Sequence, residues 1–137
     1  MDPKKATILL LDNDSKHRSF IRKSLVKLGF ENITEVNSRA LAEAQMEKQD
    51  FSILLTEFSD ESDEAFISKI KEEGHIPVVI VISWESRKER VVAAIKAGID
   101  DYILKPHTEV TLTSKILDAL EKVPHIKDSI GAHFTPE

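Results

Sequence analysis

The chain of 137 residues contains no cysteine, which excludes disulfide bridges and metal sites built from thiolates. A reducing compartment suits such a protein, and we expect it in the cytoplasm. The chain also lacks a hydrophobic run of the roughly 20 residues that a helix needs to cross a bilayer. The first apolar run, from Ile8 to Leu11, ends at Asp12 and is typical of a strand rather than a signal peptide.

The chain has no excess of positive charge either. Its formal net charge is -5 at pH 7, which argues against direct binding to a nucleic-acid backbone, and we expect no membrane contact. Charged residues make up 31% and hydrophobic residues 41%, a balance typical of a folded domain. We therefore expect one domain over residues 1–123. Residues 124–137 have no clear hydrophobic period and are either a linker to another domain or a strip that docks on the surface.

Short apolar runs alternate with longer segments of helical period throughout this domain. Strands are predicted over residues 6–12, 32–36, 51–56, 76–83 and 101–106. Helices are predicted over residues 15–28, 64–73, 86–97 and 109–122, with a further helix capped by Ser38 or Asn37. Because the apolar runs are continuous rather than alternating, the strands should be covered on both faces. The pattern predicts an α/β protein with a parallel sheet between two layers of helices.

The helical period also predicts which side chains face the core. On the first two helices these are Phe20, Ile21, Leu25, Leu28, Ala40, Leu41, Ala44 and Met46. On the third and fifth helices they are Phe66, Ile67, Ile70, Val110, Leu112, Ile116, Leu117 and Leu120. Each of these helices should bury one apolar stripe against the sheet.

Polar side chains follow the predicted strands at their carboxyl ends, where ligands bind in open parallel sheets. They are Asp12, Asn13 and Asp14 after the first strand, Thr56 and Glu57 after the third, Ser83 after the fourth, and Lys105 with Pro106 after the fifth. Oxygen ligands of this kind hold Mg²⁺, and a lysine ammonium neutralises an anion. The pattern predicts a site for a divalent cation and an anionic group at this edge of the sheet.

The chain resembles the receiver domains of response regulators, the phosphoaccepting modules of two-component signalling, and is especially similar to the single-domain chemotaxis type. The resemblance covers residues 6 to about 122 and rests on "ILLLDND", "LVKLGF", "PVVIVIS" and "AAIKAGIDDYILKP". The spacing of Ala-Gly, Tyr and Lys-Pro in the last stretch is the most specific feature. The resemblance implies a flavodoxin-like (βα)5 fold, doubly wound, with parallel strands in the order 2-1-3-4-5.

In that family an acidic pair and an aspartate bind Mg²⁺, and the aspartate takes a phosphoryl group from a histidine kinase. The resemblance implies that Asp12 is the first acid of the pair and that Lys105 and Ser83 contact the phosphoryl group. Tyr102 matches the aromatic residue that turns inward on activation, and Pro106 is implied to follow a cis peptide bond.

Two positions depart from the family pattern. Asn13 stands in the place of the second acid, for which Asp14 compensates in part. The third strand ends without an aspartate: aligning "FSILLTEF" puts Glu57 at the phosphoacceptor position, whereas counting back from the next helix puts Thr56 there. We favour Glu57. The resemblance then implies a weak Mg²⁺ site made by Asp12 and Glu57, with Asn13 and Asp14 as further ligands.

These departures predict weak or absent phosphorylation. The carboxylate of Glu57 lies one methylene further out than that of an aspartate, which disfavours aligned attack on a phosphoryl donor. A neutral amide at Asn13 weakens a site for a hard cation. We expect an atypical receiver in which contact between Glu57 and Lys105 takes the place of phosphorylation, with no organic cofactor and no enzymatic activity.

The resemblance also implies an output through protein–protein contacts. The partner would be a histidine kinase, a phosphotransfer protein or an output domain, bound at the surface of residues 86–97, 101–106 and 109–122; a homodimer is a further option. Trp84, directly after the strand hydroxyl, would cover the site, anchor a partner or lie flat on the next helix.

Three other functions stay open at this point. Conventional Mg²⁺-dependent phosphoacceptance through the non-standard residues is one, and a purely structural docking module is another. The third is an enzyme on the same fold. The absence of a phosphate-binding loop after the first strand argues against a flavin-binding protein. The absence of a nucleophilic Asp or Cys argues against a phosphatase. The five histidines are scattered without metal-ligand spacing, and we expect them to be structural or exposed.

Overall fold

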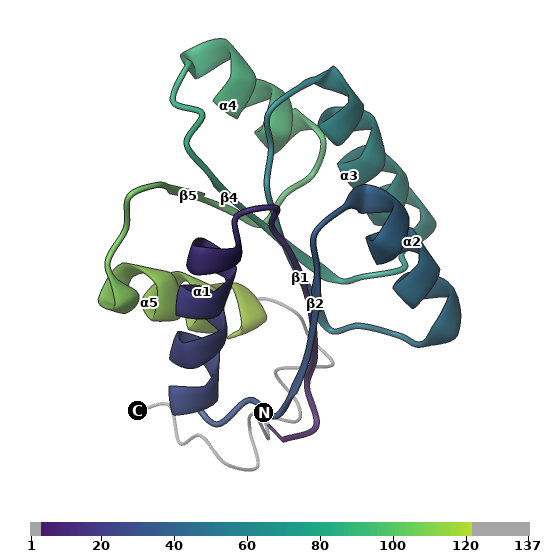
Figure 1. The fold of residues 1–137 in the computed structure, drawn as a ribbon. Coiled ribbons are helices and arrows are strands. Elements are labelled where there is room, and N and C mark those ends of the chain that lie inside the picture. Colours follow the sequence, from purple (N-terminus) through teal and green to yellow (C-terminus); the bar gives the residue numbers. More distant parts are fainter. Residues whose placement is uncertain (1–3, 122–137) are drawn as a thin grey trace.

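The computed structural model describes residues 4–121, in which five strands alternate with five helices (Figure 1). The strands are β1 (Thr7–Leu11), β2 (Asn32–Val36), β3 (Ile53–Thr56), β4 (Val78–Ser83) and β5 (Asp101–Leu104). The helices are α1 (Ser15–Lys27), α2 (Arg39–Lys48), α3 (Glu61–Glu73), α4 (Lys88–Lys96) and α5 (Glu109–Glu121). The strands pair in parallel in the order β2-β1-β3-β4-β5, which confirms the predicted fold class and strand order. The tail predicted over residues 124–137 lies outside the described residues.

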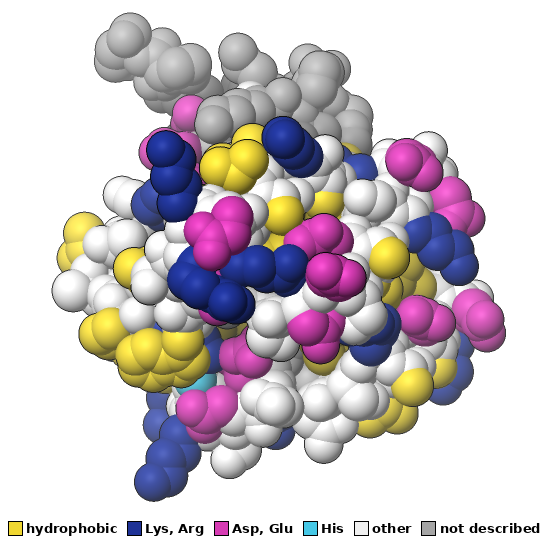
Figure 2. Space-filling model, turned by 90° about the horizontal axis from the view of Figure 1, so that it is seen from above, with side chains coloured by type: hydrophobic (Ala, Val, Ile, Leu, Met, Phe, Trp, Pro, Cys, Tyr) yellow, Lys and Arg dark blue, Asp and Glu magenta, His cyan; other side chains and the backbone are white. Residues whose placement is uncertain are grey.

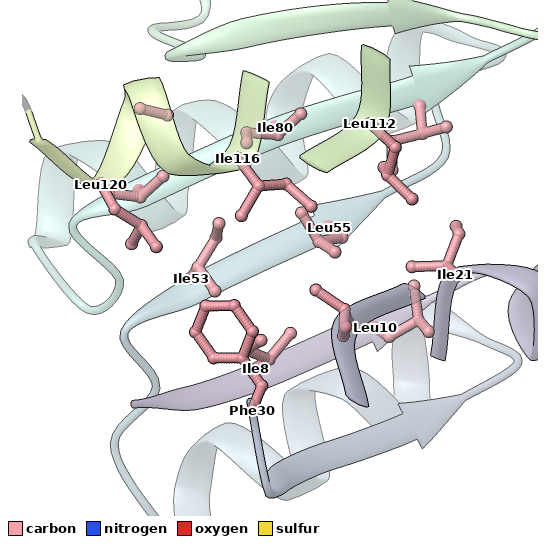
Figure 3. Close-up of a cluster of buried hydrophobic side chains, with 14 of the residues drawn as sticks. Ile8, Leu10, Ile21, Phe30, Ile53, Leu55, Ile80, Leu112, Ile116 and Leu120 are labelled. Atoms are coloured by element: carbon pink, nitrogen blue, oxygen red, sulfur yellow. The ribbon is translucent and has the colours of Figure 1, made fainter. Parts of the chain in front are cut away.

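Helices cover both faces of the sheet, with α1 and α5 on one side and α2, α3 and α4 on the other (Figure 1). Successive residues of a strand point to opposite faces, so Ile8 and Leu10 of β1 pack toward α1 and α5, while Leu9 packs on the other side. Figure 3 shows the cluster of buried side chains between the sheet and helices α1 and α5, in which Ile116 and Leu120 of α5 face the strands. Burial on both faces explains the continuous apolar runs of the strands.

Helix α3 begins earlier than the hydrophobic period predicts, at Glu61 rather than at residue 64. A capping box explains the difference: the Asp60 side chain accepts a hydrogen bond from the Asp63 amide, and the Asp63 side chain accepts one from the Asp60 amide. The helix ends at Gly74, whose φ of 68° lies in the left-handed region that suits glycine.

The predicted core faces of the helices are only partly correct. Buried as predicted are Ile21, Leu25, Phe66, Ile67, Ile70, Leu112, Ile116 and Leu120. In contrast, Leu41 and Val110 are 50% and 75% exposed, and Ala40, Ala44 and Phe20 are exposed as well. On α2 only Ala42 is buried, because its small side chain is the one that faces the sheet.

Candidate functional site

The carboxyl ends of the strands form one edge of the sheet. Leu11 of β1 is in register with Thr56 of β3, and Ser83 of β4 with Leu104 of β5, so the residues that follow these strands emerge together. Figure 2 shows this end of the molecule from above, with acidic and basic side chains interleaved over its middle. The predicted site residues therefore lie at one end of the fold.

Lys105 lies between two carboxylates at this edge. Its Nζ donates a hydrogen bond to Oε1 of Glu57 at 2.5 Å and another to Oδ2 of Asp12 at 3.2 Å. The side chains of Lys105 and Asp12 are each 2% exposed, whereas that of Glu57 is 29% exposed. An ammonium this buried requires a counter-charge, and here it has two. The peptide bond between Lys105 and Pro106 is cis, as the resemblance implies.

The two carboxylates differ in acidity. Burial by itself raises the pKa of Asp12, but hydrogen bonds from His17, the Asp14 amide and Lys105 outweigh it and lower the pKa from 3.8 to about 2. Burial also raises the pKa of Glu57, and the neighbouring Asp12 charge adds to this, so that the hydrogen bond from Lys105 offsets the rise only in part. Asp12 is therefore the stronger acid of the pair.

Both carboxylate oxygens of Asp12 accept hydrogen bonds within the chain. Oδ1 accepts from the Asp14 amide at 2.8 Å, and Oδ2 accepts from Nδ1 of His17 at 2.6 Å as well as from Lys105. The Asp14 side chain caps α1 by accepting from amides of its first turn, and Asn13 is exposed. Within residues 4–121 no three acidic or histidine side chains are grouped to hold a metal ion. This donor set does not fit Mg²⁺, which would have to displace Lys105 or His17 from Asp12.

Ser83 and Tyr102 both bind the backbone of Glu85. The amide of Glu85 donates to Oγ of Ser83 at 3.0 Å, and its carbonyl accepts from the Tyr102 hydroxyl at 2.5 Å. The Ser83 hydroxyl donates in turn to the carbonyl of Phe58 at 2.6 Å. Burial raises the pKa of the Tyr102 phenol, which keeps it a donor. The loop after β4 is thus tied to both β5 and the loop after β3.

Thr56 has a different position from Glu57. It is the last residue of β3 and is 2% exposed, and its hydroxyl donates to the carbonyl of Glu57 at 3.1 Å. The side chain that reaches Lys105 from this segment is that of Glu57. Trp84 is 63% exposed, and an indole this exposed does not close the site.

Sequence reasoning missed two histidines. His17 of α1 donates to Asp12, and its Nε2 lies 2.8 Å from Nε2 of His107 in the loop after β5. Burial lowers the pKa of His107, and the nearby His17 and Lys105 add to this. The two rings come from positions 90 residues apart, so no spacing motif could have indicated the pair.

Comparison with known proteins identifies the class of protein that this fold and site define. The family model of the response regulator receiver domain matches residues 8–117, and the chain belongs to this family. It is therefore a receiver domain of two-component signalling, as its resemblance implies. Within residues 4–121 no helix has the length and apolar character required to cross a membrane.

Individual relatives cover most of the chain. Chemotaxis protein CheY-3 of Vibrio cholerae is 30% identical over 125 residues, 88% of this chain and 95% of the relative. The chemotaxis protein CheY homolog of Campylobacter jejuni is 29% identical over 118 residues, 82% and 91% of the two chains. Among solved structures, the orphan response regulator HP1043 of H. pylori is similar with a TM-score of 0.77 and 29% identity, covering 85% of this chain and 98% of that one. The chemotaxis response regulator CheY4 of Vibrio cholerae has a TM-score of 0.74 and 16% identity, and the match covers 84% of this chain and 98% of that one. At this identity the likeness shows the fold alone.

Proposed function

We propose that this receiver is held in one signalling state by the ion pair of Glu57 with Lys105 rather than by a phosphoryl group. The 2.5 Å contact between Oε1 of Glu57 and Nζ of Lys105 carries the proposal. In the family this lysine contacts the phosphoryl group. That group carries a charge of about -2 and three acceptor oxygens, and the ammonium neutralises part of the charge. Glu57 brings a negative charge to the same ammonium without any covalent step.

The surroundings of Glu57 support this reading over phosphoryl transfer. A nucleophile must be free and aligned with its donor, with the reacting atoms about 3–3.5 Å apart. The carboxylate of Glu57 is bound to a buried ammonium instead, and both oxygens of Asp12 are engaged away from a metal. We also infer that Glu57, not Thr56, is the equivalent of the phosphoacceptor, because Thr56 is buried in the strand and bonds backbone.

The output would be a contact with another protein on the face of α4, β5 and α5. This face exposes apolar side chains, among them Ile95 at 58% and Leu104 at 47%. A hollow of about 550 Å³ lies beside Leu104, lined by Tyr102, Leu104, Pro106 and Thr111 among others. Apolar surface around a hollow is suited to an anchor side chain of a partner. We therefore propose a cytoplasmic binding module without catalytic activity, which a kinase, a phosphotransfer protein or an output domain reads.

A titration with BeF₃⁻ and Mg²⁺ tests the proposal, with fluorescence of Trp84, the single tryptophan, as the readout. We expect no saturable change in the wild type and a Mg²⁺-dependent change in Glu57→Asp, whose shorter side chain releases Lys105. Glu72→Asp, an exposed position on α3, is the matched control. A saturable Mg²⁺-dependent response of the wild type would show conventional phosphoacceptor behaviour and refute the proposal.

A second experiment separates the switch from a purely structural docking module. Glu57→Gln keeps the size of the side chain and removes its charge, so the Glu57–Lys105 ion pair is lost. We expect amide resonances of Ser83, Trp84, Glu85 and Tyr102 to shift in NMR spectra, because these residues form the loop that meets the site. If only the immediate neighbours of Glu57 shift, the site is a relic and the docking module is the better account.

A further inference from the structure

A groove lies between α2 and α3, which run side by side on the face of the sheet opposite to α1 and α5 (Figure 1). Its volume is about 250 Å³, and its apolar lining comes from Met46, Phe66 and Ile70. Phe66 and Ile70 are 7% and 2% exposed and form the floor, whereas Met46 is partly exposed. The receiver site at the strand ends uses none of these residues.

The groove exists because polar contacts join α2 to α3 only near the start of the two helices. Arg39 in the first turn of α2 donates to the Ser62 hydroxyl at 3.0 Å and forms an ion pair with Asp63, both in the first turn of α3. Within residues 4–121 no hydrogen bond or ion pair joins the later turns of these helices. Helix α2 buries only the small side chain of Ala42, so space remains beside the flexible side chain of Met46.

The size and lining of the groove favour a protein side chain over a small molecule. Small-molecule sites usually enclose about 300–1,000 Å³ and contain several polar groups that fix the ligand. This groove is smaller, and its buried residues, Phe66 and Ile70, offer no polar side-chain group. An apolar hollow with a polar margin is typical of sites that receive an anchor side chain of a partner. Met46 suits such a contact, because a methionine adapts its shape to what it packs against.

The exposed margin of the groove is mainly acidic. It carries Glu43, Glu47 and Glu73 against one lysine, Lys69. The carboxylate of Glu73 lies 3.3 Å from the ring of His75, which also lines the groove. Glu43 and Glu47 have no hydrogen bond or ion pair within residues 4–121. They are four residues apart on one side of α2, where like charges repel, so a basic partner would relieve this repulsion.

We propose that the groove between α2 and α3 is a docking site for another protein. A segment of that protein inserts one large apolar side chain against Met46 and Ile70 and places Lys or Arg beside the two free glutamates of α2. The apolar side chain supplies affinity by leaving water, and the basic residues fix the orientation of the segment. The groove is separate from the face of α4, β5 and α5, so the receiver has two docking surfaces. Neither the Glu57–Lys105 ion pair nor a phosphoryl group takes part in this contact.

Selection of short random peptides displayed on phage tests the groove. The full chain is the immobilised target, and free Met46→Gln, which keeps the length of the side chain and removes its apolar character, is present in excess to remove peptides that bind elsewhere. We expect the surviving peptides to share a large apolar residue flanked by Lys or Arg. The affinity of one such peptide, synthesised, should fall about tenfold or more in Glu43→Lys/Glu47→Lys. The charge-matched control Glu31→Lys/Glu121→Lys changes two exposed positions outside the groove and should bind as the wild type does.

The methyl resonance of Met46 in NMR spectra gives a second readout. We expect it to shift on addition of the peptide, while the methyl resonances of Ile95 on α4 stay in place. The absence of surviving peptides, survivors without basic residues, or an equal loss of affinity in the two charge-reversal variants would overturn the proposal. A shift of Ile95 without one of Met46 would place the peptide on the face of α4, β5 and α5 and would overturn it as well. Far-UV circular dichroism verifies that each variant is folded.

Two further measurements distinguish other occupants of the groove. A wild-type dimer in sedimentation that dissociates in Met46→Gln would assign the groove to a second copy of the chain. A changed Met46 resonance in peptide-free Phe134→Ser would assign it to residues 124–137 of the same chain. Either result would overturn the proposal. Glu57→Gln should bind the peptide as the wild type does, so this outcome is separate from that of the proposed switch.

Discussion

The hydroxyl of Tyr102 donates a hydrogen bond to the backbone carbonyl of Glu85, 2.5 Å away, and joins β5 to the loop after β4. The amide of the same Glu85 donates to Ser83 Oγ at 3.0 Å. The two residues that the resemblance implies as switch partners thus bind opposite sides of one residue. We expect a change at either side chain to move Glu85 and the neighbouring Trp84.

Replacement of Tyr102 by Phe removes the hydroxyl and leaves the Glu85 carbonyl without its donor. We expect a loss of about 1 kcal/mol in the free energy of unfolding, because the carbonyl is near the surface and water replaces the donor in part. Trp84 fluorescence should change as the loop is released. Urea unfolding and emission spectra measure the two effects, with Ser86→Ala in the same exposed loop as the control. An unchanged emission spectrum would mean that Tyr102 does not hold the loop.

Lys105→Met should destabilise the domain by about 3 kcal/mol, because it leaves the buried Asp12 beside the charge of Glu57 without a cation. The measurement is urea unfolding at neutral pH. The double variant Lys105→Met/Glu57→Gln removes one of the two charges and should recover part of the loss. Losses that simply add would show that the three side chains do not act as one group.

The lowered pKa of Asp12 predicts how the free energy of unfolding changes at acid pH. Its pKa is about 2 in the folded chain and near 3.8 when exposed, so its ionised form favours folding. That contribution, about 2 kcal/mol, is present above the unfolded pKa and is lost as the pH falls from about 4 to about 2. Glu57 acts in the opposite direction: its raised pKa means that protonation favours the folded state, and stability falls as the pH rises through its titration.

The measurement is the free energy of unfolding at several pH values between about 5 and 2.5 for the wild type and Asp12→Asn. The acid slope should be shallower in Asp12→Asn than in the wild type. Glu57→Gln should retain the slope below the unfolded pKa of Asp12, because the Asp12 contribution is intact. Equal slopes for the wild type and Asp12→Asn would contradict the lowered pKa.

Much of the fold could be predicted because its signals are local. Each strand is a continuous apolar run, and the order of such runs and helices limits the topology to a few arrangements. The core side of α2 could not be predicted, since Leu41 and Ala42 are adjacent and only packing decides which one faces the sheet. The polar residues at the strand ends were predicted to meet at one edge, and Asp12, Glu57 and Lys105 do so. The contact between Glu57 and Lys105 was also expected from the sequence. The second hydrogen bond of Lys105, to Asp12, depends on side-chain reach, which no spacing encodes.

The contact between His17 and His107 could not be predicted from the sequence. His17 and His107 are 90 positions apart, so no motif spacing indicates that their rings meet. Their contact follows from the parallel topology, in which the start of α1 and the loop after β5 both lie at the carboxyl ends of the strands. Such pairs become visible only when side chains are placed on the backbone.

Asp100 gives a structural reason for the stretch "AAIKAGIDDYILKP". Its Oδ2 accepts from the Val79 amide at 2.8 Å and from Nζ of Lys71 at 2.9 Å, and its own amide donates to the Val79 carbonyl at 2.8 Å. The residue therefore ties α3 and β4 to the start of β5. Asp100→Ala leaves the Val79 amide without an acceptor, and we expect a loss of about 2 kcal/mol.

Asp100→Asn offers the sharper comparison, since its side-chain oxygen still accepts from Val79 while the ion pair with Lys71 is lost. Because Lys71 is partly exposed, with 24% of its side chain accessible, the ion pair itself should contribute less than about 1 kcal/mol. Asp100→Asn should therefore retain most of the stability that Asp100→Ala loses, in urea unfolding at neutral pH. Equal losses in the two variants would show that the charge on Asp100, and not the hydrogen bond to Val79, holds β5 in place.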